Sequence, residues 1–201
     1  SPGGPATYDL RLMTSSLLPI LLGLALAAAC GFRVFAPLLI AGLAAYTGHL
    51  PLAPDFAWLG TTPALIALGT AAVLEIGAYF VPWLDHALDV LATPTAVIAG
   101  ILAAVAVMVD LPPALRWGVG VIGGGTIAGL VQGTTVLLRA KSTALTGGLG
   151  NPVVAAGETV GAIGLALLAI VAPVVQAAFA VVEALDDTAR GTGGFGSTGQ
   201  R

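Results

Sequence analysis

A charged residue lies in the middle of the longest apolar stretch of this chain. The stretch runs from Leu17 to Tyr46 and is interrupted by Gly31-Phe32-Arg33 and, a little later, by Pro37. Each half is too short to cross a hydrocarbon core of about 30 Å, which needs about 20 helical residues, whereas one continuous helix would measure about 45 Å. We therefore predict a helical element that is broken near Arg33 and is kinked, tilted or folded back.

The composition places the chain among membrane proteins. Hydrophobic residues make up 57% and charged residues 8% of the sequence, and the mean hydropathy is +1.00. Soluble domains carry about 25% charged residues. We expect an all-α, polytopic transmembrane bundle of five to six membrane elements within residues 15–185, in a lipid bilayer and specifically in a bacterial cytoplasmic (inner) membrane. Residues 1–14 and 186–201 are polar and rich in Gly, Pro and Ser, and we expect them to be disordered extensions.

Charge and cysteine content exclude several functions. The net charge is -3 and there is no basic run, which argues against nucleic acid as a partner. Cys30 is the single cysteine, so an internal disulfide cannot form. No Ser/His/Asp or Cys/His arrangement is present in a supporting context. We therefore expect no enzyme activity, no cofactor and no metal.

Prolines divide the rest of the chain into apolar segments. Several of them follow a polar capping residue, a position where the missing N–H has no cost. Short helices are expected to follow the prolines at 82 and 173, and Arg139 and Lys141 are expected to lie in a positively charged loop beyond the fourth apolar segment. The expected apolar segments are Pro63–Val81, Pro94–Val109, Trp117–Leu138 and Pro152–Ile170.

Glycines recur at four-residue steps in the fourth segment. Gly125, Gly129 and Gly133 would form one flat helical face, and Gly157 and Gly161 in the next segment offer a matching face. Such small-residue faces let helices approach closely in lipid, where van der Waals contact is the main attraction. We expect Gly129 to contact another helix, and we expect a homo-oligomer or a membrane-protein partner.

An inverted repeat is suggested by two similar stretches. Leu59-Gly60-Thr61-Thr62-Pro63 and Leu149-Gly150-Asn151-Pro152 each precede an apolar segment that ends at a proline. Three crossings between the copies would reverse their direction through the membrane, as in many transporters. Chance similarity in a chain rich in Ala, Gly and Leu is the alternative.

Ionisable side chains within the apolar segments mark the candidate solute or ion site. Arg33, Glu75 and Glu158 are costly to bury and should pair with one another, while Asn151 begins the last long segment beside a glycine-rich turn. We expect Glu75 to be the first partner of Arg33 because it lies deeper, with Glu158 as the second choice. One cation between two carboxylates would leave an excess of negative charge. The alternative is a structural ion pair that fixes helix register.

Two further polar features have a weaker claim to function. Asp85, His86 and Asp89 form an acidic cluster on an amphipathic turn, which is usually solvated at the membrane interface. The glycine-rich turn from Thr146 to Asn151 could hold an anion on free backbone N–H groups, but a tight turn between helices explains it equally.

Four strings of residues carry a resemblance to a known family. They are Gly31–Leu39, Phe56–Pro63, Val73–Asp85 and Thr146–Val154. With these strings the chain resembles, over about residues 14–180, a bacterial integral-membrane family described as domain of unknown function 4126. The resemblance implies a polytopic membrane protein and no particular substrate.

These observations lead to two hypotheses about function. The first is a small transporter or channel-like protein for an unknown small solute or ion, with an intramembrane polar site around Arg33. The second is a non-transporting scaffold or accessory subunit of a membrane complex, in which the same charges hold helices in register. A water-accessible cavity that reaches Arg33 would favour the first hypothesis, and a dry, packed Arg33 the second.

Overall fold

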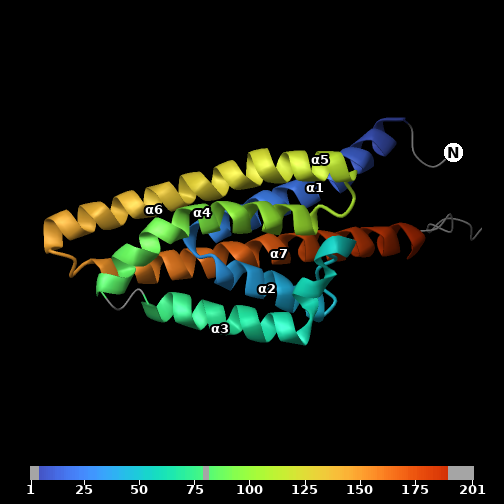
Figure 1. Cartoon of the computed structure of the whole chain (residues 1–201). Helices are drawn as coiled ribbons and strands as arrows, with labels where there is room; N and C mark the ends of the chain where they lie inside the picture. Colours follow the sequence, from blue (N-terminus) through green and yellow to red (C-terminus); the bar gives the residue numbers. More distant parts are fainter. Residues whose placement is uncertain (1–4, 79–81, 190–201) are drawn as a thin grey trace, which may run out of the picture.

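The computed structural model describes the backbone of residues 5–78 and 82–189 and the side chains of residues 17–78 and 91–172. Over these residues the chain is helical and contains no strand, which confirms the predicted all-α class. A 3-10 helix precedes α3, and a π-helical turn joins α5 to α6. The elements are α1 (Pro5–Phe32), α2 (Phe35–Tyr46), η1 (Pro54–Gly60), α3 (Thr62–Ala78), α4 (Pro82–Val107), α5 (Pro113–Val119), η2 (Gly120–Gly124), α6 (Gly125–Thr146) and α7 (Asn151–Ala189) (Figure 1).

Two helical stretches are long and apolar enough to cross a bilayer, namely Pro113–Thr146 and Asn151–Ala172. A third span results if η1 and α3, which are bent by 66° relative to each other, are counted as one broken span. The remaining apolar helices, Leu17–Phe32, Phe35–Tyr46 and Leu91–Val107, are only 10–17 residues long. Length and composition in the described residues thus support two or three spans, fewer than the five to six that we predicted.

Several helix boundaries differ from those predicted at prolines. α4 continues through Pro94, and α7 continues through Pro173 to Ala189, so neither residue separates two helices. A proline inside a helix removes one hydrogen bond, and membrane bundles tolerate this where neighbouring groups compensate for it. α6 also extends to Thr146, well beyond the predicted end at Leu138. At the N-terminus, α1 begins at Pro5, so helical backbone covers most of the segment that we expected to be disordered.

The predicted break in the first apolar element is confirmed between α1 and α2. Pro37 explains its position, because proline cannot donate to the carbonyl of Arg33 and its ring would clash with that group in a continuous helix. The chain turns back at the break (Figure 1). Accordingly, Leu22 of α1 and Leu50, just beyond α2, line the same cavity of about 160 Å³.

The α1–α2 turn lies inside the bundle. In Figure 1 the connection from α6 to α7 forms the left end of the bundle, and the α1–α2 turn does not reach that end. A Cβ on Gly31 would lie 2.6 Å from Cβ of Val131 on α6, so these two helices touch there. Val131 is separated from Thr146, the last residue of α6, by about 22 Å of helix at 1.5 Å per residue. The turn is therefore enclosed by neighbouring helices rather than exposed at an end of the bundle.

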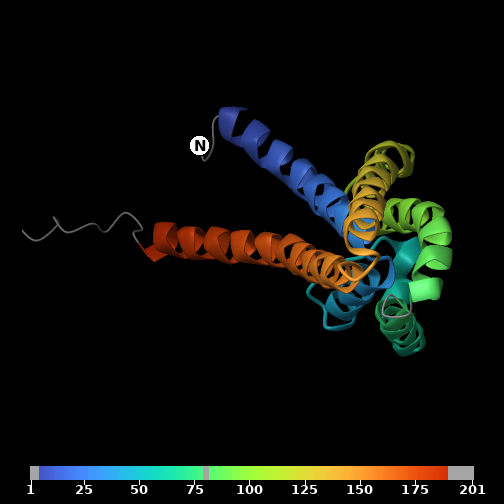
Figure 2. The same cartoon turned by 90° about the vertical axis from the view of Figure 1, so that its left-hand side faces the viewer.

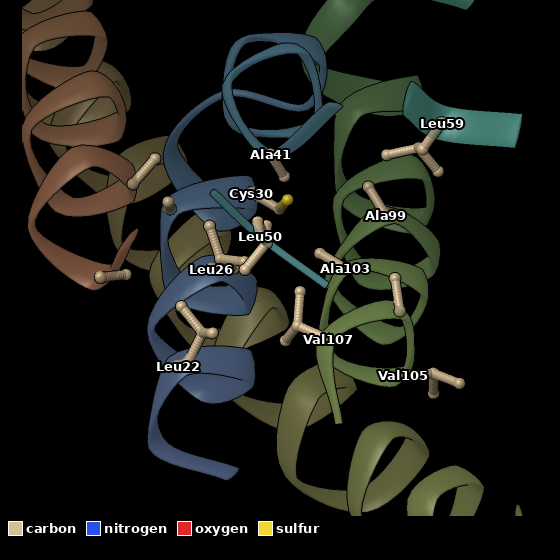
Figure 3. Packing of buried hydrophobic residues seen from close by; sticks show 14 of the residues in the cluster. Leu22, Leu26, Cys30, Ala41, Leu50, Leu59, Ala99, Ala103, Val105 and Val107 are labelled. Atoms are coloured by element: carbon tan, nitrogen blue, oxygen red, sulfur yellow. The ribbon is translucent and has the colours of Figure 1, made fainter. Parts of the chain in front are cut away.

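The core is built around α1, which packs against α4, α6 and α7. Figure 3 shows Leu22, Leu26 and Cys30 of α1 next to Ala103 and Val107 of α4. Toward the N- and C-terminal ends, α1 and α7 diverge from the bundle (Figure 2).

The connection between α2 and α3 is partly buried. Ala53 donates its backbone N–H to the carbonyl of Ala106 at 2.8 Å. Leu50, Phe56 and Leu59 are each at most 5% exposed and belong to the main core cluster. This segment therefore fills space beside α2 and α4, and α3 begins only after it.

The glycines of α6 pack against α4. A Cβ on Gly129 would lie 3.2 Å from Val97, which confirms that Gly129 contacts another helix, and one on Gly125 would lie 3.1 Å from Ile101. A Cβ on Gly133 would meet no described atom within 4 Å. Gly125 and Gly129 of this face thus pack against α4.

The glycines of α7 do not complete that face, contrary to our expectation. A Cβ on Gly161 would lie 3.8 Å from the ring of Phe32, and one on Gly157 would meet nothing within 4 Å. The inverted repeat is not supported either. At the proline that ends the first copy the chain passes from α3 to α4, whereas α7 continues through the corresponding proline.

Candidate functional site

Four charged side chains gather around the α1–α2 turn, and we refer to them as the charged cluster: Arg33, Glu75, Arg139 and Glu158. Arg33, Arg139 and Glu158 are at most 4% exposed, and Glu75 is partly buried. They come from the turn itself, α3, α6 and α7 respectively. Burial of charge on this scale is stable only where the charges compensate one another and are hydrogen-bonded.

Arg33 is held by one face of α7. Its Nε donates to Oγ1 of Thr159 at 3.1 Å, and its Nη2 donates to the carbonyl of Ala155 at 2.8 Å. Nη2 also lies 3.5 Å from Oε2 of Glu158. Because residues three and four positions apart share a helix face, one stretch of α7 presents all three oxygens to the guanidinium.

Glu75 binds the backbone at the start of α2. Its two carboxylate oxygens accept the N–H groups of Val34 at 2.7 Å and of Phe35 at 3.1 Å. These N–H groups are among those that the first turn of a helix leaves without a partner, and Val34, at the N-cap position, has no side-chain oxygen to offer. The side chain of Glu75 therefore caps α2 from a neighbouring helix. The ion pair that Arg33 forms in the structure is with Glu158, our second choice, and the pairing of Arg33 with Glu75 stays a prediction.

Arg139 is a central member of the cluster, although we had expected it in a loop. It lies within α6, and its Nε donates to Oε1 of Glu158 at 3.0 Å while its Nη2 donates to Oε2 of the same carboxylate. Buried, two-bonded pairs of this kind are the strongest that arginine forms. With Arg139 included, the cluster contains two cations and two carboxylates, which removes the excess negative charge that we had expected.

Sequence reasoning missed Arg139 because it stands next to Lys141 near the end of an apolar stretch. A signal for it was nonetheless present. Ala128, Gln132, Thr135 and Arg139 are spaced by four, three and four residues, and each is at most 3% exposed. That spacing is the period of a buried helix face. It predicts that Arg139 points into the bundle.

Asn151 lies in the turn between α6 and α7. Gly147 and Gly148 have φ angles of 63° and 91°, and Asn151 donates its side-chain N–H to Oγ1 of Thr143 at 3.0 Å. The hydroxyl of Thr146 accepts the N–H of Gly150 at 2.9 Å. These bonds agree with the interpretation as a tight turn between helices. Along α7, Asn151 is about 10 Å from Glu158 at 1.5 Å per residue, so it is outside the charged cluster.

The side chains of Asp85, His86 and Asp89 lie outside the described residues, and the acidic cluster that they were predicted to form therefore stays a prediction. Among the described residues there is no group of three or more His, Cys, Asp or Glu side chains that could hold a metal ion.

Two cavities flank the charged cluster. The larger, of about 370 Å³, lies among the α1–α2 turn, α3 and α4, and Glu75 is on its wall. The smaller, of about 270 Å³, lies between α3 and α7, and Arg33 is on its wall. Both walls otherwise consist almost entirely of apolar side chains. Among the described residues, each cavity wall therefore has one charged side chain in apolar surroundings.

Short matches link the chain to curated deoxyuridine 5'-triphosphate nucleotidohydrolases. The enzyme of Dinoroseobacter shibae is 69% identical over 32 residues, which are 16% of this chain and 21% of that protein. The enzyme of Thiobacillus denitrificans is 68% identical over 32 residues, which are 16% of this chain and 22% of that protein. The chain thus spans about a fifth of the length of these relatives.

No solved structure matches the chain. The family model described as "Domain of unknown function (DUF4126)" matches residues 20–185, which include the turn, both cavities and the whole charged cluster. The resemblance drawn from the sequence is confirmed, and the chain belongs to this family of unknown function.

Proposed function

We propose that the protein is a small transporter or channel-like protein of the bacterial cytoplasmic membrane, with the charged cluster as its intramembrane site for a small solute or ion. The observation that carries the proposal is the position of Arg33. It stands at a helix break inside the bundle and lines a cavity, although it is only 1% exposed. Broken helices and ionisable groups at membrane depth are typical of solute and ion sites in transporters. The proposal includes no catalytic step.

Two observations favour the second candidate, a non-transporting scaffold, and the first is the burial of Arg33, which is only 1% exposed. Arg33, Arg139 and Glu158 bond to one another and to α7, which would also hold helices in register. The two candidates predict different effects of a conservative substitution at the charged cluster. A scaffold loses stability only, whereas a transporter loses uptake in a protein that is still folded.

Uptake by proteoliposomes, screened over ions and small polar solutes, tests the proposal. The sharpest variant is Thr159→Val, which keeps the shape of the side chain but removes the oxygen that accepts from Arg33. Thr134→Val is its matched control, because the Thr134 hydroxyl is exposed and donates only to Leu130 of its own helix among the described contacts. We expect Thr159→Val to slow uptake and Thr134→Val to leave it unchanged. Absence of uptake above that of empty liposomes, or equal rates for both variants, would favour the scaffold.

Association with a second copy or with another membrane protein is also part of the proposal. Gly133 and Gly157 leave room beside α6 and α7, since a Cβ on either would meet nothing within 4 Å among the described residues. Small residues of this kind admit close approach of a further helix in lipid. Replacing both by leucine should then reduce the size of the particle in detergent. An unchanged size would remove this contact from the proposal.

A further inference from the structure

The cavity beside Glu75 has the size and wall of a small-molecule site. Its volume of about 370 Å³ lies within the range of ligand pockets, which have mostly apolar walls with a few polar groups. The wall is formed by the start of α2, the second half of α3 and the middle of α4. Among the described residues on it, two have polar side chains, Glu75 and Thr95.

These two side chains offer hydrogen-bond acceptors and no donor. The carboxylate of Glu75 accepts from the backbone through both oxygens, and a carboxylate has further lone pairs available. The hydroxyl of Thr95 donates its proton to the carbonyl of Leu91 at 2.7 Å, so its free lone pairs can only accept. The nearby N–H groups of Val34 and Phe35 are already bound to Glu75. A ligand that binds to these two side chains therefore has to supply the donor.

Among the described residues, the exposed part of the cavity wall is apolar. Leu74 on α3 and Leu91 on α4 line the cavity and are 66% and 64% exposed. α3 packs mainly against α2 and η1, and its described residues make little contact with α4. In a bilayer, exposed apolar side chains of this kind would face acyl chains, so we expect an apolar molecule to reach the cavity from the membrane.

We propose that this cavity binds a small amphipathic molecule from the bilayer, with an apolar body between α3 and α4 and a hydroxyl or ammonium head that donates to Glu75. An anionic head is disfavoured, because it would place acceptor against acceptor and negative charge against negative charge. The described wall of this cavity carries no cation, and Arg33 lines the other cavity. The inference holds whether or not the protein transports a solute.

Photo-crosslinking with matched probes tests the proposal. The probes are alkyl chains of equal length that carry a diazirine and end in a hydroxyl, an ammonium or a carboxylate group. They are added to the full chain in lipid nanodiscs, and the labelled peptides are identified by mass spectrometry. One hydrogen bond to the carboxylate should favour either donor probe over the carboxylate probe by about ten- to one-hundred-fold. The label should fall on the cavity segments of α3 and α4. Labelling by the carboxylate probe that equals or exceeds that of both donor probes would overturn the proposal.

Pocket-filling variants provide the second test. Ala78→Phe places a ring in the cavity, and Val73→Phe is the matched control because Val73 lies on the same helix, is 72% exposed and does not line the cavity. Ala92→Leu fills the cavity from the α4 side, in case Ala78→Phe does not fold. We expect both filling variants to lose most of the labelling and Val73→Phe to keep it. Unchanged labelling in a folded filling variant would overturn the proposal. Because binding is measured without uptake, this result is separate from the fate of the proposed transport.

Discussion

Arg139 and Glu158 are joined by two hydrogen bonds between neighbouring helices, with both side chains at most 4% exposed. The same carboxylate lies 3.5 Å from Nη2 of Arg33. Glu158 thereby connects α6, α7 and the end of α1 through one group. Loss of this carboxylate would leave two buried guanidinium groups without their shared counter-charge.

The first prediction concerns this pair. Arg139→Met should lower the free energy of unfolding by about 3–5 kcal/mol, because it leaves the buried charge of Glu158 without its closest partner. Adding Glu158→Gln removes that charge, so the double variant should lose less than the sum of the two single variants. Unfolding in detergent, followed over the full two-by-two set, measures the coupling. Strictly additive losses would contradict it.

The control for this cycle lies in another part of the molecule. Nη2 of Arg116 is 3.2 Å from Oδ2 of Asp55, whose side chain is 72% exposed. An exposed partner is screened by solvent, and such pairs contribute about 0–1 kcal/mol. Asp55→Asn should therefore change stability by less than about 1 kcal/mol. A loss as large as that from Arg139→Met would show that the assay does not separate buried from exposed pairs.

A second prediction separates the two carboxylates as partners of Arg33. Arg33→Met should couple more strongly with Glu158→Gln than with Glu75→Gln, because the ion pair is with Glu158 and Glu75 binds backbone N–H groups. Two double-variant cycles that share Arg33→Met measure both coupling energies in the same assay. Equal coupling to the two carboxylates would mean that Glu75 is a direct counter-charge of Arg33.

A third prediction compares two glycines in long helices. A Cβ on Gly100 of α4 would lie 2.4 Å from Cβ of Ala128 and 3.2 Å from the carbonyl oxygen of Gly124, so Gly100→Ala should push α4 away from α6. Overpacking of this kind costs about 1–3 kcal/mol. Gly164→Ala on α7 meets no described atom within 4 Å and should stabilise α7 by up to about 1 kcal/mol through higher helix propensity. Thermal unfolding of both variants checks the opposite signs, and destabilisation by Gly164→Ala would indicate a close neighbour there.

The sequence was sufficient to predict the helical class and the break near Arg33. The apolar composition determines the helical class. Pro37, whose ring blocks a continuous helix, determines the position of the break. We predicted helix boundaries at Pro94 and Pro173, but proline is tolerated there inside α4 and α7. Whether a proline breaks a helix or is tolerated inside it depends on whether the residues next to it can fold back on the helix. Tertiary packing decides this.

The charged cluster could be predicted only in part. Arg33, Glu75 and Glu158 stand out because each interrupts an apolar segment, but their partners depend on how the helices are placed around the turn. We did not predict Arg139 as a member of the cluster because its neighbours suggested a loop. The spacing of Gln132, Thr135 and Arg139 nevertheless marks a buried helix face. The cap that Glu75 provides for α2 requires two helices to meet, so no local pattern predicts it.

The last prediction uses Cys30 as a reporter of the α1–α2 turn. Cys30 is the only cysteine of the chain, is fully buried and lies in the last turns of α1. In the native protein it should react very slowly with N-ethylmaleimide. Glu75→Ala removes both acceptors from the start of α2, and loss of a helix cap costs about 0.5–2 kcal/mol, so opening of the turn should rise by about two- to thirty-fold. The rate at which N-ethylmaleimide modifies Cys30 should rise with the opening of the turn.

The control for this experiment is Thr70→Ala on the same helix. The Thr70 hydroxyl is exposed and donates to the carbonyl of Ile66 within α3, so its loss leaves the start of α2 capped. We expect Thr70→Ala to react at the native rate. Glu75→Gln keeps one carbonyl oxygen as an acceptor and should react at a rate between those of the native protein and Glu75→Ala. If Glu75→Ala stays folded and Cys30 remains as slow as in the native protein, then Glu75 does not hold the turn closed, and the stability of the turn must come from the bonds between Arg33 and α7.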